Sequence, residues 1–89
     1  MSALQGPANI EYSITNPSIT LLVDTDERTL VPRELNGEAT FTSSKSSRTD
    51  VCVIKDNASR CGADGDGNWP WAQTCTAVFQ GAMLSKRAA

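Results

Sequence analysis

Short segments of alternating apolar and polar residues, separated by turn-forming dipeptides, constrain the fold of this sequence most. Residues 9–15 place Ile10 and Tyr12 on one face and polar side chains on the other, which is the period of a half-buried strand. Asn16-Pro17-Ser18 then supplies a turn, and residues 19–23 follow as a second, more apolar strand. The sequence therefore predicts a β-hairpin near the N-terminus.

The same pattern continues along the chain and predicts four more strands, at residues 29–31, 38–42, 50–55 and 74–79. Turn signals separate them, so we expect an all-β fold, a small antiparallel β-sandwich or barrel of about six strands. The stretch after Phe79 also has a partly helical period, which adds a short C-terminal helical turn as an option. No linker or repeat interrupts the sequence, and residues 1–89 are predicted to form a single β-rich domain.

Composition excludes several classes of function. The chain has 89 residues and a net charge of −2, and its lysines and arginines are spread among acids. Without a basic stripe, we do not expect it to bind nucleic acid. No apolar run approaches the roughly 18 residues of a transmembrane helix, and residues 1–7 lack the basic and apolar regions of a signal peptide. A location in a virion or outside the cell stays open.

The segment from Cys61 to Cys75 has the most unusual chemistry. It contains three of the six glycines, both tryptophans and two of the three cysteines. Glycine and proline disfavour regular structure over residues 62–70. We therefore expect a loop there, and loops are where binding residues concentrate.

An alternating comb of oxygen-bearing side chains, Asp64, Asp66 and Asn68, has the spacing found in loops that bind hard cations. Two positions of the calcium-loop pattern fail, because Trp69 stands where glycine makes the sharp turn and Cys75 where a glutamate closes the cage. Asp-Gly and Gly-Asn are also ordinary turn dipeptides. We therefore expect no metal and no other cofactor, and keep the comb as a weak metal candidate.

Trp69-Pro70-Trp71 is the candidate binding motif, together with Asn68. Proline holds its neighbours extended, so two indole rings could project as a pair that contacts a protein or a carbohydrate. The alternative is that at least one ring packs on the core, because the domain has only five aromatic residues.

The three cysteines predict a structural disulfide. A bridge between Cys61 and Cys75 would close a loop of ~15 residues and contribute ~3 kcal/mol in the chain-entropy model. Cys52 lies in a predicted central strand and points inward as a buried thiol, or it pairs with Cys61 across the Asp56-Asn57 turn. Three cysteines without histidine, and without the spacing of zinc ligands, are a poor zinc set.

The sequence contains no histidine. This removes the Ser-His and Cys-His nucleophile pairs and the commonest general base at neutral pH. The acidic residues lie in polar turns, where solvent keeps them ionised. We therefore expect that the chain is not an enzyme.

A β-meander with a cysteine-bounded loop before its last strand, formed by residues 50–61 and 74–79, resembles the coat proteins of small single-stranded RNA phages. The resemblance implies an antiparallel β fold. Those coat proteins continue into C-terminal helices that make their dimer, and a chain whose last strand ends at Phe79 leaves no room for them before Ala89. No site residue is transferred from this family.

Two functions follow from these observations. The first is a structural protein that packs on itself or on a larger particle, such as a virion coat or decoration subunit. Its support is the Ser- and Thr-rich strands, the lack of catalytic groups and the missing signal peptide. The alternative is a small secreted binding module, lectin-like, an inhibitor or an effector, that uses the Cys61–Cys75 loop with its two tryptophans. A protein partner or a homo-oligomer is expected in either case.

Overall fold

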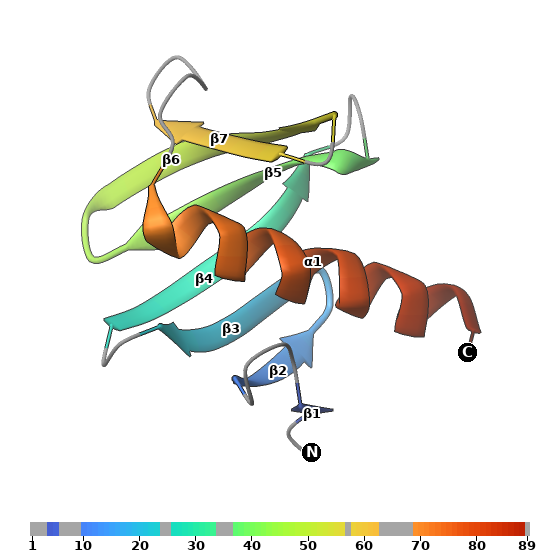
Figure 1. The fold of residues 1–89 in the computed structure, drawn as a ribbon. Helices are drawn as coiled ribbons and strands as arrows, with labels where there is room; N and C mark the ends of the chain where they lie inside the picture. The colour runs from blue at the N-terminus through green and yellow to red at the C-terminus, as the bar shows by residue number, and fades with distance from the viewer. Residues whose placement is uncertain are drawn as a thin grey trace.

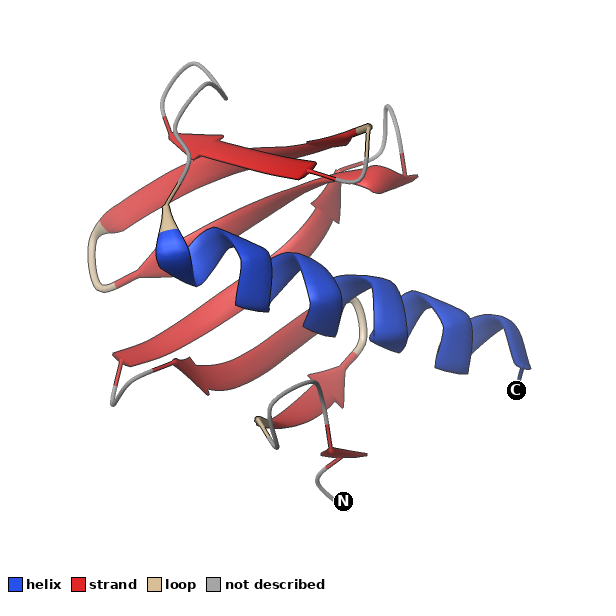
Figure 2. Ribbon diagram, viewed as in Figure 1, coloured by secondary structure: helices blue, strands red, loops and turns tan. Residues whose placement is uncertain are grey.

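The computed structural model shows one twisted antiparallel sheet with a single helix across one of its faces (Figures 1 and 2). It describes residues 4–5, 10–23, 26–33, 37–56, 58–62 and 69–88. The strands follow one another in the sheet in the order of the sequence, so every neighbouring pair is a meander connection. The protein is mostly β and compact, with a radius of gyration of 11.8 Å.

Six strands form the body of the sheet, and a two-residue strand, β1 (Leu4–Gln5), extends it beside β2. The six are β2 (Glu11–Thr15), β3 (Ser18–Val23), β4 (Asp26–Arg33), β5 (Gly37–Lys45), β6 (Arg48–Lys55) and β7 (Ala58–Gly62). The helix α1 (Pro70–Ala88) follows β7.

The predicted N-terminal hairpin is confirmed. Strands β2 and β3 pair antiparallel through Tyr12 with Leu21 and Ile14 with Ile19. These apolar side chains share one face of the sheet because side chains alternate along a strand. The Asp56-Asn57 turn is also confirmed at Asp56, which has a φ of 53° and directly follows β6. Aspartate tolerates this left-handed conformation better than most residues.

Helix α1 packs across β3, β5 and β7 and encloses the core against the sheet. Its buried positions, Ala72, Cys75, Phe79 and Ala82, recur every three or four residues, which is the spacing of one helix face. Phe79 stacks on Phe41 of β5 with ring centroids 4.6 Å apart. The core therefore lies in a single layer between the sheet and this helix.

The strand predicted at residues 74–79 is wrong, because these residues lie in α1. Threonine, valine and phenylalanine favour strands only weakly, and burying the helical face against the sheet outweighs that preference. Pro70 is the first residue of the helix, where its missing N–H costs nothing. The helix also replaces the short C-terminal turn that the sequence suggested.

The predicted β-sandwich or barrel is not confirmed; the six main strands form one open sheet. Strand β7 was not predicted, since the loop was expected to begin at Cys61. Strand β5 continues to Lys45, three residues beyond the strand predicted at residues 38–42. Pro32 lies inside β4 next to a register shift, a position at which a sheet accommodates proline.

Candidate functional site

The loop between Cys61 and Cys75 has only its ends within the described part of the chain. Asp64, Asp66 and Asn68 lie outside the described residues. Trp69 directly precedes α1, and its carbonyl accepts a hydrogen bond of 3.0 Å from the N–H of Ala72. The helix therefore begins at Pro70, the last residue of the loop predicted over residues 62–70.

The disulfide joins Cys52 to Cys61. The predicted bridge between Cys61 and Cys75 is therefore wrong, and the alternative pairing of Cys52 with Cys61 is confirmed. Cys52 and Cys61 face each other directly across β6 and β7, with Cα atoms 4.1 Å apart. The change of direction after Asp56 brings them together. The bridge therefore fastens the edge strand to its neighbour and lies fully buried beneath α1.

Cys75 is a free and fully buried thiol on the inner face of α1. Burial raises its pKa to about 11, although the nearby Arg28 charge and a hydrogen bond with Ser43 act in the opposite direction. At neutral pH the thiol is therefore protonated. Because the thiolate is the reactive form, this cysteine behaves as a core residue and not as a nucleophile.

The two tryptophans have different surroundings. Trp71 is half-buried against the core, and the guanidinium carbon of Arg28 lies 3.5 Å from the centroid of its ring. This geometry is a cation–π contact. Trp69 is 43% exposed. The motif therefore does not present a pair of rings, and Trp69 alone offers an exposed indole for binding.

A buried polar cluster, formed by Arg28, Ser43 and Asp50, lies beside Trp71 and was not predicted. Arg28 donates a hydrogen bond of 3.0 Å to the Ser43 hydroxyl, and its Nη1 lies 4.0 Å from Oδ2 of Asp50. Arg48 donates to the other oxygen of Asp50 at 3.1 Å. Every charge in the cluster has a partner, as buried charges require.

The cluster connects three strands to the first turns of α1, because its members come from β4, β5 and β6 and its guanidinium contacts the helix through Trp71. A signal for it exists in the sequence: alternation along residues 28–30 places Arg28 on the same face as Leu30. An inward-pointing arginine predicts a buried partner. We assign the cluster a positioning role for the helix.

No group of three or more side chains suited to a metal ion occurs among the described residues. The weak metal candidates Asp64, Asp66 and Asn68 are outside that part of the chain and stay a prediction. None of the described helices is both long and apolar enough to span a membrane.

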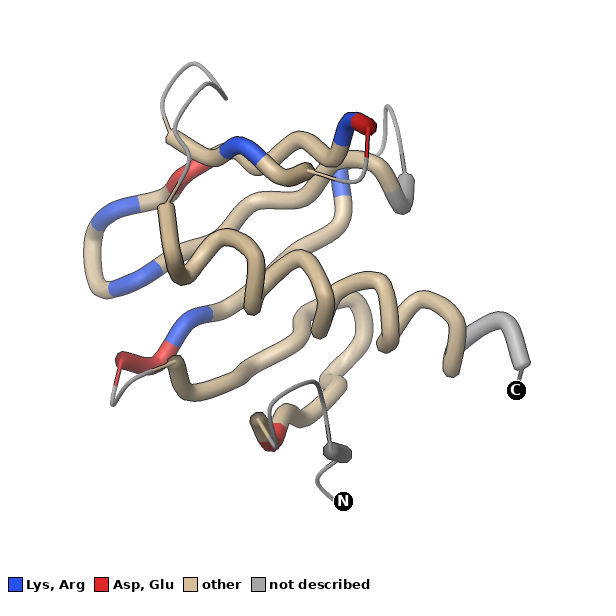
Figure 3. The backbone as a smooth tube through the Cα atoms, viewed as in Figure 1, with Lys and Arg blue, Asp and Glu red and all other residues tan. Residues whose placement is uncertain are grey.

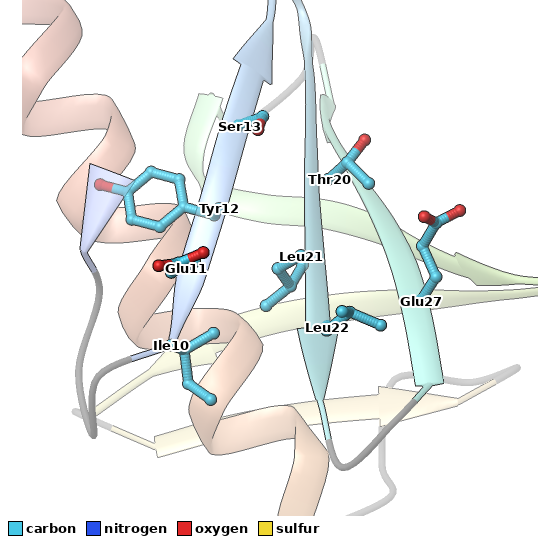
Figure 4. A pocket seen from close by; sticks show the side chains of 8 residues that line it. All are labelled: Ile10, Glu11, Tyr12, Ser13, Thr20, Leu21, Leu22 and Glu27. Atoms are coloured by element: carbon cyan, nitrogen blue, oxygen red, sulfur yellow. The ribbon is translucent and has the colours of Figure 1, made fainter. Parts of the chain in front are cut away.

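The face of the sheet opposite α1, called the open face below, is covered by no described helix or strand. Figure 4 shows Thr20, Leu22 and Glu27 pointing away from α1, whereas Tyr12 and Leu21 point toward it. Leu22 is 57% exposed. These side chains, with others from β2 and β3, line an open recess on the surface.

A continuous row of hydroxyl side chains crosses this open face. Consecutive members are direct cross-strand partners from β2 to β6. The last two hydroxyl oxygens of the row lie 3.0 Å apart. The row consists of Ser13, Thr20, Thr29, Ser44 and Thr49. Neighbouring strands are about 4.8 Å apart, so the open face carries a line of hydrogen-bonding groups with regular spacing.

Comparisons with known proteins add no assignment. No family model matches the chain, and no curated protein or solved structure is significantly similar to it. One of the two segments that carried the resemblance to phage coat proteins, residues 74–79, is helical and not a strand. The function is therefore inferred from the geometry of the sheet and helix.

Proposed function

We propose that this chain is a non-enzymatic structural protein that packs on copies of itself, as the subunits of a larger particle such as a coat do. The supporting observation is the composition of the open face. An antiparallel sheet with one solvated face normally places polar residues on that face. On this open face, by contrast, the middle row of cross-strand partners consists of Val31, Thr42 and Val51, from three neighbouring strands. Val53 lies in the next row, so apolar side chains occupy the middle of a face that no described element covers.

The chemistry of the covered face supports a non-enzymatic role. The sequence contains no histidine, and Cys75 is held as a protonated, buried thiol. The Ser43 hydroxyl accepts a hydrogen bond from Arg28, which has no basic nitrogen to activate it. The reactive side chains near Trp71 thus serve packing.

The size of the chain also supports assembly. A domain of 9.5 kDa encloses a small core, and its single layer leaves half of the sheet surface outside that core. Binding to another copy stabilises a folded chain by mass action, since the unfolded chain does not bind. A subunit with this architecture gains stability in the particle.

Solution mass tests the proposal. We expect sedimentation velocity and native mass spectrometry of the purified, non-reduced chain to show a defined homo-oligomer at micromolar concentration. The oligomer should dissociate on dilution while each chain keeps its circular dichroism spectrum. A folded monomer at every concentration up to the millimolar range would exclude self-assembly.

The alternative, a secreted module that binds a protein or a carbohydrate, is supported by the exposure of Trp69. Exposed tryptophans stack on sugars and anchor protein interfaces. If this function holds, Trp69→Ala should abolish binding on a glycan or protein array without lowering the melting temperature. Trp71→Phe serves as the contrast, because it changes a half-buried ring on the covered side.

A further inference from the structure

We infer that the open face is the contact surface between copies of the chain: two chains pack open face on open face, with the acidic end of each over the basic end of the other. This inference rests on the proposed self-assembly and names the surface that performs it. The pair forms a two-sheet sandwich, with the helices on its two outer sides.

The charges of the open face are separated along the strand direction. At one end, Glu27 of β4 is exposed beside Leu22, its direct partner on β3. Glu11 and Glu27 both line the open recess described above for β2 and β3. No ion pair joins Glu27 to a described residue. This end of the face is therefore acidic.

The opposite end is basic. Lys55 and Arg60 are exposed and line a second recess at the β6–β7 turn, which also includes Asp56. Arg33 lies at the same end of β4, six residues from Glu27 along that strand. Among the described residues, these three cations stand against two acids, Asp56 and Glu38 of β5. This end therefore carries a net positive charge, opposite in sign to that of the Glu27 end.

The centre of the open face, between these two ends, has the composition of an interface core. Valine and hydroxyl side chains occupy it in the described strands, and all of its members are half-buried within the single chain. Protein interfaces place uncharged residues at the centre and charged residues at the rim. The central side chains are Val31, Thr42, Val51 and Val53.

A two-fold axis that lies between two open faces and runs across the strand direction satisfies both features. In such an isologous contact the same surface serves both chains, and the rotation brings the acidic end of one chain onto the basic end of the other. Sheets pack face to face at about 10 Å, which the side chains of the central rows fill. Complementary charges then fix the orientation of the pair.

The outer side of α1 is the rival contact surface. Residues 70–85 of α1 carry no charge (Figure 3), and Leu84 near the end of this stretch is 64% exposed. A single helix presents a narrower surface than six strands. Its two cations, Lys86 and Arg87, are adjacent in its last turn, so the helix does not combine an acidic and a basic end that would orient a second copy. The open face is therefore the better supported of the two.

Charge reversal tests the arrangement. Glu27→Lys and Arg60→Glu each place like charges across the proposed contact, so each should weaken self-association about tenfold at low salt. The variant with both changes restores opposite charges and should recover the association of the unchanged chain. The measurement is sedimentation velocity over a concentration series, and the effects of the single changes should shrink in 1 M salt because the charges are screened.

Control variants distinguish an effect at the proposed contact surface from a general effect of net charge and from unfolding of the variant. Gln80→Lys and Gln80→Glu alter the charge of the exposed side of α1, and neither should change association. Circular dichroism and thermal melts identify any unfolded variant. If a reversal variant unfolds, Glu27→Gln and Arg60→Gln replace it, each with an expected two- to fourfold weakening.

The outcomes distinguish this inference from the proposed function. If neither charge reversal weakens self-association, or if the double change does not restore it, the open-face contact is overturned and the proposed self-assembly still holds. An oligomer that responds to the Gln80 variants alone places the contact on α1. A chain that stays monomeric overturns both.

Discussion

The two faces of the sheet come from the same strands and have opposite properties. The covered face holds the fully buried side chains of Ile19, Leu30 and Phe41, and beside them a paired charge cluster. The open face carries hydroxyls, valines and charges at its ends, and no described element shields it. Alternate residues along each strand thus separate what stabilises the chain from what is free to contact a partner.

The contrast teaches which part of the molecule can change without loss of the fold. Substitutions on the covered face disturb the packing of α1. Substitutions on the open face change side chains that no described helix or strand covers. Stability and assembly should therefore respond to different residues of the same strand.

Neighbouring residues of β5 give the sharpest contrast. Phe41→Ala removes a buried ring that stacks on Phe79 and should lower the free energy of unfolding by about 3–5 kcal/mol. Thr42→Ala, on the open face, should change it by less than about 0.5 kcal/mol at a concentration where the chain is monomeric. Urea denaturation measures both, and equal effects would break the distinction between the faces.

The disulfide gives the next largest effect. Replacing both Cys52 and Cys61 with alanine removes a cross-link with a sequence separation of 9, worth about 2–3 kcal/mol in the chain-entropy model. Cys75→Ala keeps the cross-link and is the matched control. Mass mapping of non-reduced peptides checks the pairing, and a peptide linked through Cys75 would contradict it.

The buried thiol gives the smallest effect, which appears at high pH. Its pKa is raised from 9.0 to about 11 in the folded chain, so above pH 9 the unfolded chain ionises Cys75 while the folded chain keeps it protonated. The free energy of unfolding should fall between pH 9 and pH 11, by about 2 kcal/mol in total. Cys75→Ala should remove that part of the pH dependence; an unchanged slope would show that the thiol is not shielded.

The sequence predicts those parts of the fold whose signal is local. Alternation gives the first hairpin and the apolar strand at residues 50–55, because a period of two is visible within five or six residues. Residues 58–62 lack that signal: alanine, serine and glycine favour strands poorly. They join the sheet because β6 offers an edge and the Cys52–Cys61 bridge joins the two strands.

The helix shows where local preference fails. Residues 74–79 contain β-favouring side chains, yet the spacing of Ala72, Cys75 and Phe79 is helical. This spacing stabilises a helix only when the apolar face packs against the sheet, so it outweighs the local preference only in the folded chain. The split between Trp69 and Trp71 depends on the same packing, since the helix carries the second ring onto Arg28. The polar partners of that arginine, Ser43 and Asp50, come from strands distant in sequence, which no local pattern reveals.

Cross-linking at the centre of the open face tests the central claim most directly. Thr42→Cys, in a chain where Cys75→Ala removes the free thiol, places a single reactive group near the proposed two-fold axis. A short bismaleimide should join two such chains efficiently, whereas Gln80→Cys on the outer side of α1 should give no linked dimer. Efficient linkage at residue 80 with none at residue 42 would contradict the account.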